Sequence, residues 1–482
     1  MPPLDESAYS LVLDQGGHSS RALVLDAAGK TLATAQRSVD TVESPGGRVE
    51  QDGAAILTGL RECIGEIRHT LGGEAGRIRQ AGLAVQRGSV LCWDRVSGEV
   101  LSPVLSWRDR RTLGDDLQGL SADAVRAATG LRFSPYGGAA KLAWCLKNLP
   151  LVSQALAQGR LAMGPLGSFL VHGLLADQPF VVDHSLAQRS LLWSRHDRNW
   201  SGKLLTAFGL PRQALPEVSD SRADFGPFRD LPTCHLQRLM GDQNAVPWCV
   251  GMPQMDDVLI NMGTGAFMLR PIGPGQEPGP FQYSLLQSGR EPEFALEASL
   301  HGAGAAIAWL ESASGQRIQA EDIQASLGRV QNPPLFLNTV DGLGSPWWQS
   351  GIEPVFVRQG RVIAVADLGI DSAISGLLES LAFLIRVNLD IMESLAGPAH
   401  RLVLAGGLSQ SRELCQRIAT LLDRDVHRLT AVEATAMGLF YHLAEQSSGH
   451  SALERIPPHS AMSVENRYRE WLSIMPPVPL FR

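Results

Sequence analysis

Two stretches of the chain, about half its length apart, share one design: an apolar run, a polar turn with glycine, and a second apolar run. The first, YSLVLDQGGHSSRALVL, covers residues 9–25, and the second, VLINMGTGAFMLR, covers residues 258–270. Such a pattern is typical of β-hairpins. Because Asn261-Met262-Gly263-Thr264 can be laid over Asp14-Gln15-Gly16-Gly17, the pattern predicts a chain built from two similar halves.

The length of the chain, 482 residues, agrees with two halves, since domains average roughly 100–200 residues. We therefore expect an N-terminal domain over residues 1–250 and a C-terminal domain over residues 251–482. The chain is 44% hydrophobic and 19% charged, as is usual for globular proteins. Its net charge of -7 disfavours nucleic acid as a partner, because nucleic-acid binding needs a basic surface.

The cysteines and the apolar runs bear on the compartment. Six cysteines are scattered without a C-x-x-C pair, which favours neither a zinc site nor a disulfide framework. No run of about 18 apolar residues occurs, and the first residues, MPPLDESAYS, lack the pattern of a secretory signal. We expect a cytoplasmic protein that does not bind a membrane.

Four segments of the second half carry further predictions. Ala295–Glu311 is rich in small residues and is predicted to form a closely packed helix, and Ile374–Leu395 has apolar residues near helical spacing. Arg401–Ala405 is predicted to be a strand that leads through two glycines to a helix from about Arg412, a turn that can bind an anion. The Ser- and Pro-rich residues from 445 onward are expected to be peripheral.

The opening turn carries residue types suited to phosphate. Backbone N–H groups and hydroxyls of a Gly/Ser turn can wrap a phosphate, and a carboxylate such as Asp14 can hold Mg²⁺ directly or through water. Asp242, in a Gly-Asp-Gln turn just before the expected domain junction, could accept a proton from a hydroxyl during phosphoryl transfer. The chain has neither G-x-x-x-x-G-K-[ST] nor a G-x-G-x-x-G after its first strand, which disfavours a P-loop and a dinucleotide fold.

A family resemblance spans nearly the whole chain. The segments that carry it, in order, are Asp14-Gln15-Gly16-Gly17-His18-Ser19-Ser20-Arg21, Val85-Gln86-Arg87, Ser106-Trp107-Arg108-Asp109-Arg110-Arg111-Thr112, Thr129-Gly130-Leu131 with Pro135-Tyr136 and Lys141-Leu142, Gly241-Asp242-Gln243, Gly263-Thr264-Gly265 with Phe267, Gly342-Leu343-Gly344-Ser345-Pro346-Trp347-Trp348, Gly406-Gly407, and Glu433-Ala434-Thr435-Ala436-Met437-Gly438. Together they resemble the FGGY carbohydrate kinases, and most of all the glycerol kinases among them.

The resemblance implies an α/β fold of two actin/hexokinase-like (ribonuclease H-like) domains with a cleft between them, and an enzyme that uses ATP and Mg²⁺ to phosphorylate a polyol or sugar. It implies that Asp242 is the catalytic base and that Asp14, together with Asp242, helps to hold Mg²⁺. The residues implied for ATP are Gly16, Gly17, His18, Ser19, Ser20, Arg21, Gly263, Thr264, Gly406 and Gly407. Those implied for the acceptor substrate are Arg87, Trp107, Tyr136, Asp242, Gln243 and Phe267.

Three positions depart from the family pattern, and one of them, Ala405 in place of an aspartate before the Gly-Gly turn of glycerol kinases, carries little weight because other kinases of the family vary there. Gly17 replaces a threonine that contacts phosphate, and the loss of one neutral hydrogen bond, worth about 0.5–1.5 kcal/mol, would slow transfer without abolishing it. Gly88 replaces a glutamate with which glycerol kinases bind the polyol hydroxyls, and hydrogen bonds to charged groups are worth about 1.5–3 kcal/mol. A larger polyol or a sugar is therefore expected as the substrate.

Three alternatives stay open from the sequence. The chain could be a glycerol kinase proper, a weakened relative that binds nucleotide or sugar, or a hydrolase of the same fold class. The sequence leaves open the sugar, the hydroxyl that is phosphorylated and any effector, and a homodimer is one of the possible assemblies.

Overall fold

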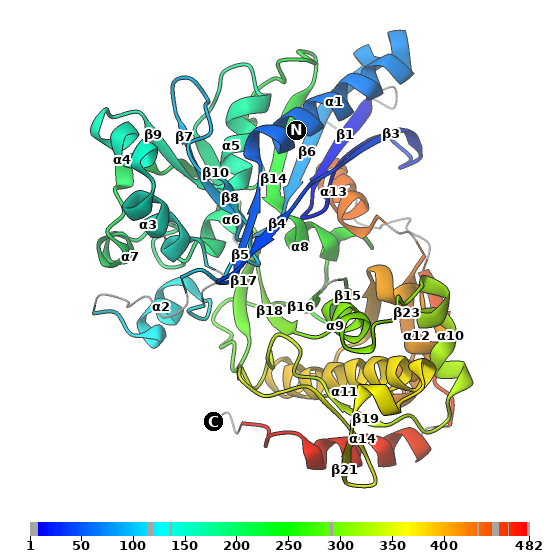
Figure 1. Cartoon of the computed structure of the whole chain (residues 1–482). Coiled ribbons are helices and arrows are strands. Elements are labelled where there is room, and N and C mark those ends of the chain that lie inside the picture. The colour runs from blue at the N-terminus through cyan, green and yellow to red at the C-terminus, as the bar shows by residue number, and fades with distance from the viewer. Residues whose placement is uncertain are drawn as a thin grey trace. The chain divides into compact units, whose positions relative to one another are not determined.

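The computed structural model describes residues 8–112, 119–134, 137–263, 265–289, 293–430, 433–445, 453–460 and 462–479. The chain divides into two units, whose elements are labelled in Figure 1. Unit 1 comprises Met1–Met252, Ser284–Glu293 and Thr435–His450, and unit 2 comprises Pro253–Tyr283, Phe294–Ala434 and Ser451–Arg482. The assignment of the acceptor to the first half and of ATP to the second stays a prediction.

The central sheet of unit 1 has the strand order β14-β6-β1-β2-β3. Its strands are β1 (Tyr9–Gln15), β2 (Ser19–Leu25), β3 (Thr31–Ser38), β6 (Ile78–Val85) and β14 (His235–Gly241). β1 and β2 form the expected antiparallel hairpin, whereas β6 runs parallel to both β1 and β14. The carboxyl ends of β1, β6 and β14 therefore lie at one edge of the sheet.

Helices cover both faces of this sheet. α1 (Gly53–Leu71) begins where the Asp52 carboxylate accepts hydrogen bonds from the N–H groups of Ala54 and Ala55, and its apolar side chains pack on the face that carries Leu11 and Leu13. α13 (Ala434–Ala444) packs with Leu439 and its neighbours against the opposite face. The alternation of side chains along β1 supplies both layers of the core.

The rest of unit 1 surrounds a second sheet, of order β4-β5-β8-β7-β9. Its strands are β4 (Val42–Ser44), β5 (Arg48–Gln51), β7 (Val90–Asp94), β8 (Val104–Leu105) and β9 (Leu161–Pro165). Two strand pairs, β10 (Val181–Asp183) with β13 (Glu217–Ser219) and β11 (Trp193–Ser194) with β12 (Asn199–Trp200), complete the strands. The remaining helices are α2 (Ala122–Thr129), α3 (Gly138–Asn148), α4 (Pro150–Ala157), α5 (Leu166–Leu174), α6 (His184–Arg189), α7 (Gly202–Phe208) and α8 (Asp242–Ala245).

The main sheet of unit 2 has the order β17-β18-β16-β15-β22-β23-β24, and its outer strand β17 continues into the segment Ser284–Glu293 of unit 1. Its strands are β15 (Asp257–Met262), β16 (Ala266–Ile272), β17 (Gln282–Gln287), β18 (Glu293–Leu300), β22 (Arg401–Ala405), β23 (Val426–Leu429) and β24 (Leu453–Ile456). β15 pairs antiparallel with β16 and parallel with β22, which repeats the arrangement of β1 with β2 and β6. The two hairpins of the sequence therefore occupy corresponding places in two sheets.

The helices of unit 2 are α9 (Gly304–Ser314), α10 (Ala320–Arg329), α11 (Ile370–Ala396), α12 (Arg412–Leu422) and α14 (Met462–Ile474). A small sheet of β19 (Leu335–Leu337), β20 (Val355–Arg358) and β21 (Arg361–Ile363) lies in the same unit. The long helix α11, yellow in Figure 1, has an extensive buried face and is the centre of the apolar core.

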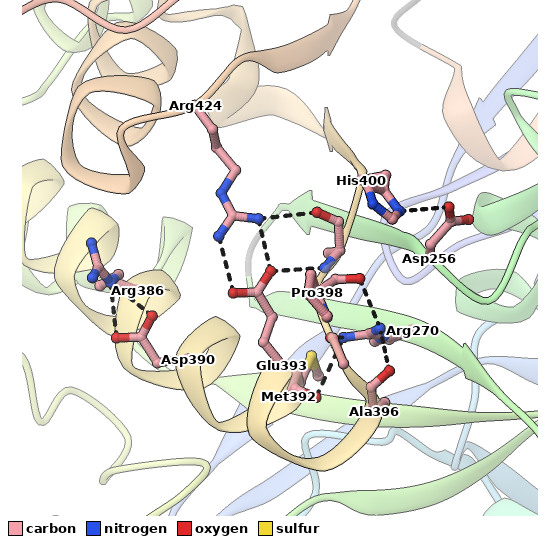
Figure 2. Close-up of polar contacts among 12 residues, drawn as sticks. Asp256, Arg270, Arg386, Asp390, Met392, Glu393, Ala396, Pro398, His400 and Arg424 are labelled. Atoms are coloured by element: carbon pink, nitrogen blue, oxygen red, sulfur yellow. Dashed lines mark hydrogen bonds and ion pairs between the residues drawn. The ribbon is translucent and has the colours of Figure 1, made fainter.

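Charged side chains fix the C-terminal end of α11 (Figure 2). The buried Arg270 guanidinium donates to the carbonyl oxygens of Ala396 at 2.8 Å and Gly397 at 2.7 Å. Glu393 pairs with both terminal nitrogens of Arg424, at 2.7 and 3.0 Å. A positive charge at a helix C-terminus satisfies carbonyls that have no partner within the helix and interacts favourably with the helix dipole.

Two predictions of the second half are wrong. Ala295–Glu311 is not one helix, because its first part belongs to β18 and α9 begins at Gly304. Small residues fit a strand as well as a helix, and Gly302, at φ +73°, turns the chain between them. The C-terminal segment is not peripheral: β24 pairs with β23, and Trp471 of α14 is fully buried in the core of unit 2.

Two further observations concern the whole chain. All six cysteines are buried thiols. Within the described ranges, the structure contains no helix with both the length and the apolar character needed to cross a membrane.

Candidate active site

Three candidate segments of unit 1 meet at the carboxyl edge of its central sheet. Gln15 at the end of β1 lies beside Val85 at the end of β6, and Val85 lies beside Gly241 at the end of β14. The backbone N–H of Gln86 donates to the carbonyl of Gln15 at 2.8 Å. The first glycine turn, the Gln86-Arg87 pair and Asp242 therefore leave the sheet side by side.

The first glycine turn is closed by a hydrogen bond from the N–H of Gly16 to the carbonyl of Ser19, 3.0 Å long. Asp14, at the end of β1, and Ser19 are half-buried, and His18 is exposed. Ser20 is buried, and its hydroxyl donates to Gln15 Oε1 at 2.6 Å. The Ser20 side chain thus belongs to the interior of the unit, whereas Ser19 stays at its surface.

Arg21 continues the alternation along β2. Its Nε donates to Oε1 of Gln36 on the neighbouring strand β3, at 3.1 Å. This contact holds the half-buried Arg21 side chain over the strand that pairs with β2.

Arg87 and Asp242 form the charged centre of the site. Arg87 Nε lies 3.9 Å from Asp242 Oδ1, and Arg87 Nη1 donates to Asn244 Oδ1 at 3.4 Å. The Arg87 side chain is only 7% exposed and that of Asp242 21%. Glycine at position 241 leaves room for the Arg87 side chain, because a Cβ there would lie 2.6 Å from Cγ of Arg87.

The environment of Asp242 favours the protonated acid. Burial raises the pKa of the Asp242 carboxyl above its ordinary value, and the Arg87 guanidinium acts in the opposite direction. Hydrogen bonding from Gln243, whose N–H donates to Asp242 Oδ1 at 2.8 Å, and the charge of Arg189 also lower the pKa. A carboxylate whose pKa is raised is a better proton acceptor than an ordinary aspartate.

Trp107 lies close to the first glycine turn. A Cβ at Gly17 would lie 3.7 Å from Trp107 Nε1 and 3.5 Å from Gln86 Oε1, both ordinary contacts. Gln86 is 2% exposed, and its Oε1 has no hydrogen-bond donor among the described residues. The small Gly17 therefore leaves an acceptor atom beside it unsatisfied.

Gly88 adopts a backbone conformation that favours glycine, with φ at +76°. It follows Arg87 directly, at the position where the resemblance led us to expect a glutamate. A glutamate in this conformation would be strained.

The second glycine turn, in unit 2, is held mainly by backbone contacts. The N–H of Gly263 donates to the carbonyl of Gly265, and the carbonyl of Gly263 accepts from the N–H of Gly304 at the start of α9, both at 3.0 Å. Gly406 follows β22, which pairs with β15 so that Ala405 lies beside Asn261. Gly263 and Gly406 therefore leave neighbouring parallel strands.

Gly406 and Gly407 differ in their surroundings. Gly406 has φ at +88°, and a Cβ there would lie 2.6 Å from both Asn261 Oδ1 and the carbonyl oxygen of Met262. A Cβ at Gly407 would meet no atom within 4 Å. Gly406 is thus required by the close approach of two strands, whereas Gly407 presents open backbone.

Phe267 lies on β16 of unit 2 opposite Asn261 and is half-buried. Tyr136 and Thr264, which the sequence also assigned to the site, lie outside the described residues.

The sequence did not assign roles to several residues that contact the site. Asn244 stands two positions after Asp242, and its side chain donates to the carbonyl of Leu285 while it accepts from Arg87. Arg189, in α6, donates to Ser284 Oγ at 2.5 Å and adds positive charge near Asp242. The Gly-Asp-Gln-Asn turn was a signal for Asn244, whereas no local pattern marks Arg189.

The structure offers two carboxylates for a cation, Asp14 and Asp242. Among the described residues no group of three or more His, Cys, Asp or Glu side chains could hold a metal ion. Such a sparse set fits Mg²⁺, which usually takes one or two carboxylates and completes its shell with water and phosphate oxygens.

Two surface cavities lie elsewhere. One, of about 540 Å³, is at the C-terminal end of α1 in unit 1, and the other, of about 400 Å³, lies along α12 in unit 2. None of the candidate site residues lines either of them.

Comparison with known proteins identifies related sequences over both halves. Residues 9–252 match the N-terminal domain model, and residues 258–444 the C-terminal domain model, of the FGGY family of carbohydrate kinases. Glycerol kinase 1 of Pseudomonas aeruginosa is 31% identical over 94% of this chain and 93% of its own length. The glycerol kinase of Alcanivorax borkumensis is 32% identical over 93% of this chain and 91% of its own length.

Solved structures share the fold. Plasmodium falciparum glycerol kinase with ADP has a TM-score of 0.80, 19% identity and coverage of 97% of both chains. Xylulose kinase from Rhodospirillum rubrum also has a TM-score of 0.80, with 19% identity and coverage of 97% of this chain and 98% of its own. These similarities confirm the predicted α/β fold of two actin/hexokinase-like domains.

Proposed function

The chain belongs to the FGGY family of carbohydrate kinases, and on that premise we propose that it transfers the γ-phosphoryl group of ATP to a hydroxyl of a polyol or sugar larger than glycerol. The predicted enzyme class, a polyol or sugar kinase, is confirmed by the family match. The observation that carries the proposal is the pairing of Asp242 with Arg87 at the sheet edge where the first glycine turn also ends.

Asp242 is the proposed base. Phosphoryl transfer needs a carboxylate that accepts the proton of the attacking hydroxyl, with the nucleophile and the leaving group in line. Burial raises the pKa of Asp242 and makes it a better proton acceptor, while the Arg87 guanidinium, 3.9 Å away, favours the ionised carboxylate. This balance supports the assignment.

The glycine turns are the proposed ATP site. The turn from Gly16 to Ser20, with Arg21 beside it, and the pair Gly263-Thr264 would bracket the phosphates, and Gly406-Gly407 would lie against the adenosine. In the first turn Ser19 would contact phosphate, and Ser20 would act through its bond to Gln15. Mg²⁺ would be held by Asp14 and Asp242 with phosphate oxygens and water, and would neutralise charge on the transferring phosphoryl group.

The acceptor would contact Arg87, Trp107, Tyr136, Gln243 and Phe267, a set that combines hydrogen-bonding groups with aromatic walls. The loop at Gly88 is the argument for a substrate larger than glycerol. Residue 88 is a glycine, so no carboxylate follows Arg87. Its φ of +76° also disfavours any other residue at this position.

A second candidate is glycerol itself. It is favoured by the names of the similar proteins from Pseudomonas aeruginosa and Alcanivorax borkumensis, both glycerol kinases at 31–32% identity. The missing carboxylate at position 88 weighs against it, because a charged hydrogen bond to the polyol would be lost.

The proposal includes a location and an assembly. Use of ATP is the argument for a cytoplasmic location. A homodimer is proposed by analogy with such kinases, and sedimentation velocity on the purified chain would test it.

The experiment measures ADP release with Mg-ATP over a panel of acceptors: glycerol, erythritol, ribitol, xylitol, arabitol, and ketoses and aldoses of three to seven carbons. The Asp242→Asn variant is measured beside the wild-type protein. We expect one of the larger acceptors to give the highest kcat/KM, and the variant to lose that turnover.

Each other outcome is informative. Highest kcat/KM with glycerol would overturn the inference from Gly88. ADP release that does not depend on acceptor would indicate a hydrolase. If no acceptor of the panel gives ADP release while ATP still binds in a nucleotide-displacement assay, the kinase proposal is contradicted. This result would favour a weakened relative that lacks the hydroxyl at position 17.

A further inference from the structure

A buried lysine lies beneath the loops that carry two of the proposed acceptor contacts. Lys141, in the first turn of α3, has no exposed surface. The sequence singled it out only as part of a Lys-Leu pair that matches the family. We propose that Lys141 is a positioning residue for the acceptor site, which holds the Arg87-Gly88 and Ser106-Trp107 segments in one arrangement.

The ammonium group binds a backbone carbonyl of each loop. Lys141 Nζ donates to the carbonyl oxygen of Ser106 at 2.7 Å and to that of Gly88 at 3.3 Å. Trp107 follows Ser106 directly, and Gly88 follows Arg87. One side chain thus joins the two segments immediately next to the proposed contacts.

The peptide unit between Ser106 and Trp107 is held from both sides. Its carbonyl oxygen accepts from Lys141, and its N–H, on Trp107, donates to Ser89 Oγ at 3.0 Å. Because a peptide unit is planar, binding both polar atoms fixes the plane of this peptide and with it the position of the Trp107 Cα, from which the side chain leaves. Ser89 is itself fully buried and follows Gly88 in the same loop.

Burial of the Lys141 ammonium group is energetically unfavourable. Burial lowers the pKa of Lys141 to about 7, and the charge of Asp109 partly offsets that effect while the charge of Arg111 adds to it. Asp109 is fully buried, and its carboxylate accepts from the N–H of Val49 at 2.7 Å and from Arg111 Nε at 3.0 Å. An apolar side chain at this position would avoid the desolvation of an ammonium group. We therefore attribute the lysine to its hydrogen bonds with the carbonyls of Gly88 and Ser106.

This inference rests on the proposed function, since it concerns the acceptor site of that reaction. A lysine that only stabilised the fold would, when lost, lower the amount of folded enzyme and leave the Michaelis constants alone. A lysine that positions Arg87 and Trp107 would, when lost, raise KM for the acceptor and leave KM for ATP unchanged. The two roles are therefore distinguished by comparing the change in KM for the acceptor with the change in KM for ATP.

The test compares Lys141→Met with Lys147→Met in the complete chain. Methionine keeps an unbranched side chain and removes the ammonium, and Lys147 is an exposed lysine of the same helix. The acceptor is the compound of the panel above with the highest kcat/KM in the wild-type protein, and glycerol is measured beside it. We expect Lys141→Met to raise acceptor KM about tenfold or more, a loss in the range of one or two hydrogen bonds to a charged group.

A second variant keeps the test decisive if Lys141→Met does not fold. Ser89→Ala removes the hydroxyl that accepts from the Trp107 N–H and changes little volume, so acceptor KM should rise by a smaller factor, about threefold. Unchanged acceptor KM in the folded variant, or an equal rise in KM for ATP, would overturn the positioning role. If the wild-type protein itself shows no acceptor-dependent turnover, the proposed function fails, and the positioning role with it; an active wild type with an unaffected Lys141→Met variant refutes the positioning role alone.

Discussion

The two glycine hairpins lie in sheets of the same plan, but the residues compared at their strand ends differ in charge. In unit 1 the turn begins at Asp14, and the neighbouring parallel strands lead to Arg87 and Asp242. In unit 2 Asn261 stands in the place of Asp14, and the parallel strand β22 beside it leads to Gly406 and Gly407, so that these three positions carry no charge. Unit 1 therefore offers side-chain chemistry at the edge of its sheet, and unit 2 offers mainly backbone.

The buried charges of unit 2 have another use. Glu379 of α11 is 1% exposed and binds Arg417 of α12 at 2.8 Å and Arg467 of α14 at 3.0 Å. Arg270 and the pair of Glu393 with Arg424 hold the end of α11 (Figure 2). These charges tie helices together. The comparison predicts that neutralising Asp242 at the sheet edge of unit 1 affects catalysis, whereas neutralising the buried Glu379 of unit 2 affects stability.

The largest effect is expected for Asp242→Asn. Loss of the base should lower kcat about a thousandfold, within the range for general base catalysis. The pKa of Asp242 is raised in the folded state, so its ionisation opposes folding, and this cost is present at pH values above the folded pKa. The variant should therefore have a higher Tm than the wild type at pH 8, and the difference should shrink as the pH falls through that pKa.

Steady-state ADP release and thermal melts between pH 4 and pH 9 would check both parts. Asp230→Asn, a change at an exposed aspartate of unit 1, is the matched control and should alter neither. The activity of the wild type should fall on the acid side at a pH above the ordinary pKa of an aspartate. A folded Asp242→Asn variant with wild-type kcat would remove Asp242 from the role of base.

The opposite result is expected for Glu379→Gln in unit 2. Removing the carboxylate leaves Arg417 and Arg467 without their buried counter-charge, and breaking such a network costs about 3–5 kcal/mol of unfolding free energy. Urea unfolding would measure the loss, with the exposed Glu413→Gln on α12 as the control. Because the residue is structural, kcat per folded molecule should stay at the wild-type value. A drop in kcat without a drop in stability would contradict the comparison.

A smaller effect is expected for the two glycines after β22. Gly406→Ala would drive its Cβ to 2.6 Å from Asn261 Oδ1 at a φ of +88°, so the turn must shift at a cost of about 1–3 kcal/mol. If the turn binds adenosine, Kd for ATP should rise about tenfold. Gly407→Ala meets no atom within 4 Å and should keep wild-type stability. Calorimetric titration with ATP would show the difference, and unchanged ATP binding in a destabilised Gly406→Ala protein would separate the turn from the nucleotide.

The hairpins were predictable because local patterns determine them. The apolar runs and glycine turns at residues 9–25 and 258–270 contain their own strand and turn signals, and the motifs around them identify the family. The parallel adjacency of β1, β6 and β14 was not predictable in the same way. It joins segments that start at residues 9, 78 and 235, and no local pattern sets the register between them.

The errors have equally specific causes. The segment Ala295–Glu311 is rich in alanine and glycine, so its composition did not distinguish a strand followed by a helix from one helix. The hydrogen bond from the Ser20 hydroxyl to Gln15 was not predicted from the sequence, and a role for Ser20 at phosphate stays a prediction. Roles for Lys141 and Arg189 depend on contacts with distant loops, which single-sequence reasoning does not supply.

The smallest effect is expected for Gly17→Thr in the first glycine turn of unit 1. This change introduces the threonine that the family resemblance led us to expect at position 17. A Cβ there fits at ordinary contact distance from Gln86 Oε1 and Trp107 Nε1, and the new hydroxyl can donate to Gln86 Oε1 or to a phosphate. One such bond is worth about 0.5–1.5 kcal/mol, so kcat should rise by roughly two- to tenfold if the hydroxyl binds the phosphate. Gly17→Val has the same shape without the hydroxyl and should show no gain. If only stability rises, with kcat equal in both variants, the hydroxyl serves Gln86, and the turn of unit 1 acts on phosphate through its backbone, as we propose for the turn of unit 2.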